Sequence, residues 1–184
     1  MKIEDVNKVV NSVDERMTYW TEIGSPIVEY YAKDLDDLMD SIRDFISKSN
    51  VDNLNVNELQ YYFVQLTNVL YFTTTNVEKV GLLMDLSNMS YKDAFNTSLL
   101  ENSTADSKLT VAKLNAMADK DSLAENVLNF IYARTYKILR AKIDSANEMI
   151  KTLSKLISYK MQVISQQNND DRFDVNTKRL LVEG

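Results

Sequence analysis

The fold is decided by the stretch Ser122–Ser165, SLAENVLNFIYARTYKILRAKIDSANEMIKTLSKLISYKMQVIS, which runs for 44 residues without Gly or Pro. Because Gly and Pro are the residues that most often end helices, the stretch predicts one long helix. At 1.5 Å per residue such a helix is about 66 Å long, which is longer than a small domain is wide. The helix must therefore pack along a partner.

An apolar row with coiled-coil spacing follows this predicted helix. Its members alternate steps of four and three residues, as the a and d positions of a heptad do. They are Tyr132, Tyr136, Leu139, Ile143, Ala146, Ile150, Leu153 and Ile157. A second row, which begins at Leu128 and Ile131, widens the stripe enough for more than one neighbour. We therefore expect a homo-oligomer held together by Leu139, Ile143, Ile150, Leu153 and Ile157.

The other side of the same predicted helix is basic. Residues 134–160 contain seven Lys and Arg residues against two acidic residues. With Tyr136 at an a position, Arg134 and Lys155 fall at f and Lys137 and Lys151 at b, so these four cations point away from the apolar row. One interpretation is a solvated helix face with pairs at i,i+4. The other is an anion-binding stripe with Tyr132, Tyr136 or Tyr159 at its edges, where these rings are able to stack on bases.

Composition points to an all-α fold. The 184 residues are 45% hydrophobic and include only three Gly and one Pro. We expect a helical bundle with a long, coiled-coil-like antiparallel hairpin whose helices lie near 56–100 and 122–165. The expected division is an acidic N-terminal helical hairpin at 1–50, the long hairpin at 51–165 and a flexible tail at 166–184.

Signals for helix ends refine these ranges. Gly24-Ser25-Pro26 predicts a break, with Ser25 as the N-cap of the next helix. Asn55 followed by Glu58 predicts the start of the long helix near 56. Residues 101–107 form the predicted joint. Ser122, with Glu125 three positions on, predicts the N-cap of the last long helix.

The absence of Cys and His limits the chemistry of this chain. Ser-His-Asp and Cys-His catalysis and imidazole-ligated or thiolate-ligated metals are excluded. Five aspartates between Asp34 and Asp44 lack the EF-hand spacing, so they predict a solvated acidic face. We expect no catalytic residue, no metal and no cofactor. With neither a membrane-length apolar run nor a signal peptide in the sequence, we expect a cytoplasmic protein.

Charge is distributed unevenly along the chain. Residues 1–105 contain eight basic against 17 acidic residues, whereas residues 106–160 contain ten against six. Either the two parts pack against each other through complementary charge, or they form separate protein-binding and nucleic-acid-binding surfaces.

Residues 59–163 resemble a family. The carrying segments are Lys108–Ala118 (KLTVAKLNAMA), Tyr136–Ile143 (YKILRAKI) and Ile150–Ile157 (IKTLSKLI), which follow a long helix and a joint. Their order resembles that of the UvsY-type recombination mediators of tailed phages. The resemblance implies a ring-like homo-oligomer that binds single-stranded DNA and a RecA-like recombinase in the host cell cytoplasm. The matching basic positions are Lys113, Lys120, Arg134, Lys137, Arg140, Lys151 and Lys155.

A second class of function stays open. The sequence pI near 4.8 opposes non-specific DNA binding and favours a helical interaction protein, such as a phage virion or scaffold component or an acidic inhibitor of a host factor. The basic stripe favours the DNA-binding accessory protein. Neither alternative is an enzyme, because no phosphate loop or ligand cluster occurs in the sequence.

Overall fold

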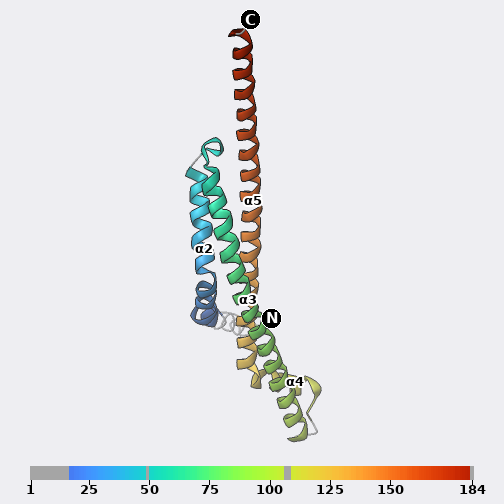
Figure 1. The fold of residues 1–184 in the computed structure, drawn as a ribbon. Helices are drawn as coiled ribbons and strands as arrows, with labels where there is room; N and C mark the ends of the chain where they lie inside the picture. Colours follow the sequence, from blue (N-terminus) through green and yellow to red (C-terminus); the bar gives the residue numbers. More distant parts are fainter. Residues whose placement is uncertain (1–16, 49, 106–108, 183–184) are drawn as a thin grey trace, which may run out of the picture. The chain divides into compact units, whose positions relative to one another are not determined.

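The computed structural model of the chain describes the backbone of residues 17–48, 50–105 and 109–182, and the side chains of these ranges up to Gln167. Within these ranges every regular element is helical and no strand occurs, which confirms the all-α prediction. The elements, shown in Figure 1, are η1 (Trp20–Gly24), α2 (Ser25–Lys48), η2 (Val51–Asn53), α3 (Val56–Ala105), α4 (Val111–Asp121) and α5 (Leu123–Val182).

The chain forms two compact units that share the long helices. Unit 1 combines Met1–Lys33 with Phe72–Ile143, and unit 2 combines Asp34–Tyr71 with Asp144–Gly184. Each of α2, α3 and α5 therefore contributes one part to each unit. The expected ranges 1–50 and 51–165 each have residues in both units, and the expected division of the chain at 165 stays a prediction.

In unit 1, parts of α3 and α5 run antiparallel. Ser87 Oγ lies 3.4 Å from Asn129 Oδ1, and Arg140 Nη1 lies 3.3 Å from Glu78 Oε1. Because the lower-numbered α3 residue meets the higher-numbered α5 residue, the two segments point in opposite directions. A hairpin over the whole of 56–100 and 122–165, with coiled-coil packing, stays a prediction. The buried apolar residues of this unit are Ala32, Val77, Val80, Ala118, Ile131, Leu139 and Ile143.

In unit 2, α2 and the first turns of α3 pack side by side. The rings of Phe45 and Tyr62 are 5.2 Å apart, and residues 51–53 between the two helices form η2. Figure 1 shows α2 and this part of α3 as neighbours. The buried apolar residues of this unit are Leu35, Ile42, Leu54, Leu59, Leu66, Leu70, Ala146 and Leu153.

The predicted break at Gly24-Ser25-Pro26 is wrong, because residues 17–48 are helical throughout. Ser25 has helical angles (φ −63°, ψ −45°), and its N–H donates to the carbonyl of Trp20, the wider spacing of a π-helix. Because Pro26 has no N–H, no backbone hydrogen bond of the helix begins at this residue. The wider turn before Pro26 therefore costs no hydrogen bond there. Gly24 allows the Trp20 ring to lie against the backbone, since a Cβ there would overlap it. The described part of residues 1–50 therefore contains no helical hairpin.

The start of α3 is as predicted. Asn55 Oδ1 accepts a hydrogen bond of 2.9 Å from the backbone N–H of Asn57, and the carbonyl of Asn55 accepts from Leu59 at 3.0 Å. The side-chain bond satisfies an orphan donor of the first turn and the carbonyl bond is the first of the helix, which together are the role of an N-cap. α3 then continues to Ala105, beyond the predicted end near 100.

The prediction that Ser122 is the N-cap of α5 is confirmed for its backbone, since its carbonyl accepts the N–H of Asn126 at 3.0 Å, but it is wrong for its side chain. Its hydroxyl donates to the carbonyl of Ala118 at 2.7 Å, so Ser122 caps the C-terminal end of α4. The side chain is fully buried and serves the turn between α4 and α5. α5 also exceeds its predicted end at 165 and reaches Val182, because neither Gly nor Pro occurs between 123 and 182 to end it.

Candidate nucleic-acid interface

The predicted basic residues all lie at the surface. α4 carries two of them and α5 carries five, and every one is exposed. They are Lys113, Lys120, Arg134, Lys137, Arg140, Lys151 and Lys155. Unit 1 contains the first five, and unit 2 contains Lys151 and Lys155.

In unit 2 the cations share their helix face with acidic residues. Lys151 Nζ donates to Glu148 Oε1 at 2.6 Å. This hydrogen bond and the charge of Lys151 lower the pKa of the Glu148 carboxyl, and the charge of Lys155 lowers it further. Asp144 lines the same shallow hollow of about 520 Å³ as Glu148 and Lys151. The positive charge of Lys151 is therefore partly neutralised before any ligand arrives.

In unit 1 one of the three predicted DNA-binding cations on α5 is paired. Arg140 Nη1 lies 3.3 Å from Glu78 Oε1, and its guanidinium lies 5.7 Å from the centroid of the Tyr136 ring. The Arg140 and Glu78 side chains are 48% and 58% exposed, so water weakens this pair and a phosphate can compete for the arginine. Arg134 and Lys137 make no ion pair with another described residue.

The tyrosines that were expected to stack on bases differ in accessibility. Tyr132 and Tyr136 are half-buried. Tyr159 is 46% exposed, and its hydroxyl lies 3.5 Å from Asp52 Oδ1, at the long limit of a hydrogen bond. Tyr159 is therefore the most accessible of the three.

The predicted oligomerisation residues belong largely to the interior of a single chain. Leu139 and Leu153 are fully buried and Ile143 is 5% exposed, whereas Ile150 and Ile157 are half-buried. Three of the five side chains are therefore inaccessible to a second folded copy. Burial within the chain therefore covers part of the apolar stripe on α5, while Leu128 at its start is 41% exposed.

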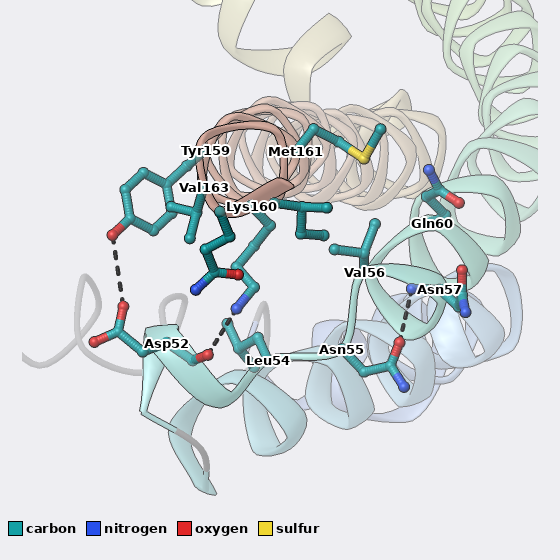
Figure 2. Close-up of a pocket in the computed structure, with 12 residues that line it drawn as sticks. Asp52, Leu54, Asn55, Val56, Asn57, Gln60, Tyr159, Lys160, Met161 and Val163 are labelled. Atoms are coloured by element: carbon teal, nitrogen blue, oxygen red, sulfur yellow. Dashed lines mark hydrogen bonds between the residues drawn. The ribbon is translucent and has the colours of Figure 1, made fainter. Parts of the chain in front are cut away.

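A polar-rimmed hollow of about 760 Å³ lies between the start of α3 and α5 in unit 2. Figure 2 shows Lys160 reaching the backbone carbonyl of Asp52, to which its Nζ donates at 2.7 Å. Val56, Met161 and Val163 supply apolar walls. Lys160 therefore ties η2 to α5 through one of its three N–H donors.

The described residues hold few groups for other chemistry. Among them, no three Asp or Glu side chains gather closely enough to hold a metal ion. On α2, Arg43 lies 2.8 Å from Asp40 and Lys48 lies 3.0 Å from Asp44, so part of the acidic face is paired. Within residues 17–48, 50–105 and 109–182, no helix combines the length and the apolar character needed to cross a membrane.

One surface was missed from the sequence, namely the outward side of α3 in unit 1. Leu82, Leu86 and Met89 are 59%, 51% and 60% exposed there. The available signal was the presence of apolar residues on more than one side of α3, which indicates a second contact face.

Comparisons of this chain with protein-family models, with curated proteins and with solved structures give no match.

Proposed function

We propose that this chain is a non-enzymatic helical accessory protein of phage recombination or replication, which binds single-stranded DNA through the exposed cations of α5. One observation carries the proposal: α5 buries Leu139 and Leu153 completely while it exposes Arg134, Lys137 and Lys155. A helix that is anchored on its apolar side presents these cations to solvent. Phosphates attract such cations without base specificity.

The partners and the location come from the resemblance to the UvsY-type mediators. It supports a homo-oligomer, a RecA-like recombinase as protein partner, and the host cell cytoplasm as location. The net charge of −6 opposes DNA binding by a single copy, which is a further reason to propose a homo-oligomer. Several copies that present the cations together gain avidity without new contacts.

The proposal is tested by the anisotropy of a labelled oligothymidylate over a salt series. We expect binding at low salt, with a slope of log K against log salt of about −0.7 for each neutralised phosphate. The double variant Lys137→Glu with Lys155→Glu should lower the affinity and flatten the slope. Helicity should not change, because both side chains are exposed.

The charge-matched control combines Lys48→Glu with Lys92→Glu, two exposed lysines of α2 and α3. It changes the net charge by the same amount and should retain most of the affinity. If the control weakens binding as much as the test variant, the cations of α5 are not the contact surface. If the parent does not bind at low salt, the DNA-binding proposal fails.

A second candidate is a protein-interaction function without nucleic acid. It is favoured by the exposed Leu82, Leu86 and Met89 on α3, since exposed apolar patches mark protein contacts. Failure of the parent to bind oligonucleotide, together with retained self-association, would favour this candidate.

A further inference from the structure

The outward side of α3 in unit 1 carries five residues that are each seven positions apart. We call Phe72, Lys79, Leu86, Asp93 and Leu100 the α3 outer row. Residues seven apart on an α-helix differ by only about 20° around the axis, so the row follows one side of the helix. Its apolar members are 66%, 51% and 66% exposed, and Lys79 and Asp93 are also exposed.

Large apolar side chains flank the α3 outer row on both sides. Leu82 and Met89 are 59% and 60% exposed, and Leu83 is 39% exposed. The row runs for 28 residues, or about 42 Å of helix. A long apolar face of this kind on a water-exposed helix indicates a protein partner.

The α3 outer row is symmetric about Leu86. Lys79 lies seven residues before Leu86 and Asp93 seven after it, while Phe72 and Leu100 lie fourteen before and after it. When a second α3 approaches antiparallel with the two Leu86 residues opposite each other, Lys79 meets Asp93 of the second copy. In the same register, Phe72 meets Leu100 of the second copy.

The two-fold symmetry repeats each contact. Asp93 of the first copy meets Lys79 of the second, so one register forms two opposite-charge pairs inside the row. The same operation places the Leu83 side of one helix beside the Leu83 side of the second, and the Met89 side beside the Met89 side. A parallel arrangement in register would place Lys79 against Lys79 and Asp93 against Asp93, and charges within a heptad row select orientation. Charge complementarity therefore selects the antiparallel pair.

We propose that two copies of this chain associate through the α3 outer row as an antiparallel, two-fold symmetric dimer centred on Leu86. Such an interface is isologous, since the same patch serves both copies. It replaces the buried residues Leu139, Ile143 and Leu153 of α5 as the self-association surface. The dimer deepens only the homo-oligomer of the proposed function and is independent of DNA binding.

Cysteine cross-linking tests the geometry. Because the chain contains no cysteine, only the introduced thiols can form disulfides. In the antiparallel dimer, Leu86→Cys places two thiols opposite each other, so mild oxidation should give a covalent dimer. Lys79→Cys alone should not cross-link, because the two copies of residue 79 lie about 21 Å apart along the helices, whereas Lys79→Cys combined with Asp93→Cys should. Efficient cross-linking of Lys79→Cys alone would indicate a parallel pair and overturn the proposal.

Charge exchange tests the register. Sedimentation equilibrium of the parent should show a dimer. Lys79→Glu and Asp93→Lys should each raise the dimer Kd, on the order of tenfold, since each creates two like-charge pairs. The double variant should restore the parent Kd. The matched control, Lys92→Glu with Asp85→Lys, changes exposed α3 charges away from the row and should leave the Kd unchanged.

A monomeric parent at high micromolar concentration overturns the proposal and leaves this face to another protein or to another segment of the chain. Failure of the double variant to restore the dimer also overturns it. Oligothymidylate binding by the parent and the same variants separates the two proposals. A parent that is dimeric but does not bind oligothymidylate contradicts only the proposed function.

Discussion

Gly81 of α3 and Tyr136 of α5 are in close contact in unit 1: a Cβ added at Gly81 would lie 3.0 Å from Cε2 of the Tyr136 ring. Gly81 is buried in the middle of a 50-residue helix, where glycine costs about 1 kcal/mol relative to alanine. The close approach of the ring explains why this position tolerates the least favourable residue other than proline. α3 and α5 come near each other here because one side chain is missing.

This contact predicts coupling between the two positions. In the Tyr136→Ala background, Gly81→Ala should stabilise the protein by up to about 1 kcal/mol, because only the helix propensity remains. In the parent the same change should stabilise less or destabilise, since the ring must move. Chemical denaturation of the four proteins gives the coupling free energy. An equal effect of Gly81→Ala in both backgrounds would contradict the steric explanation.

A second prediction concerns the polar cluster between α3 and α4. Ser98 is 6% exposed, and its hydroxyl donates to Asp121 Oδ2 at 2.6 Å. Ser98→Ala leaves the carboxylate with a weaker partner, Asn102 Nδ2 at 3.4 Å, and should lower the free energy of unfolding by about 1–3 kcal/mol. The control Ser103→Ala removes a hydroxyl that bonds its own helix and should change stability by less than about 0.5 kcal/mol.

A third prediction separates interior from surface on α5. Leu153→Ala should cost about 2–5 kcal/mol of unfolding free energy, because Leu153 is fully buried in one chain. The control Val111→Ala shortens an aliphatic side chain that is 74% exposed and should change stability by less than about 0.5 kcal/mol. A folded, near-native Leu153→Ala that only dissociates an oligomer would instead place Leu153 between copies.

A fourth prediction concerns the pKa of Glu148, which Lys151 lowers. A lowered pKa in the folded state means that the ion pair contributes above the unfolded-state pKa and is lost as the pH falls through the folded-state pKa. Lys151→Met should raise the pKa of Glu148 toward its ordinary value, and Lys155→Met should raise it less. Carboxyl carbon chemical shifts followed over pH give both values, and a larger effect of Lys155→Met would reverse the order of the causes.

A fifth prediction joins this ion pair to the proposed function. Glu148 Oε1 lies 2.6 Å from Lys151 Nζ, so Glu148→Gln removes the carboxylate that competes with phosphate for Lys151. Single-stranded DNA should then bind more tightly, and the salt slope should steepen by about 0.7 if Lys151 gains one phosphate. The control Glu101→Gln changes the same charge at an exposed position of α3. Equal gains from both variants would show a general charge effect rather than release of Lys151.

Local rules account for much of the fold. The scarcity of Gly and Pro determined that the chain is helical, and Asn55 determined where α3 begins, because propensity and capping act within a few residues. Spacing also distinguished the exposed cations of α5 from its buried apolar residues, since one helix period separates the two sides. The N-cap position of Ser122 was found but the partner of its hydroxyl was not, because the same hydroxyl can bond either of two adjoining helices.

Tertiary structure decided which apolar side is used within one chain. Leu139 and Leu86 both belong to heptad-spaced rows, yet Leu139 is fully buried and Leu86 is 51% exposed. Spacing cannot show which of the two rows is buried, since both have the same period. Burial depends on which row is covered by helices that are distant in sequence. The pairing of Lys151 with Glu148 was likewise invisible in net charge, which counts cations without showing which are neutralised. The sequence alone determined a protein of long helices with a basic side on α5. The folded chain decided that Leu139, Ile143 and Leu153 of the α5 apolar row are buried and that the α3 outer row is exposed.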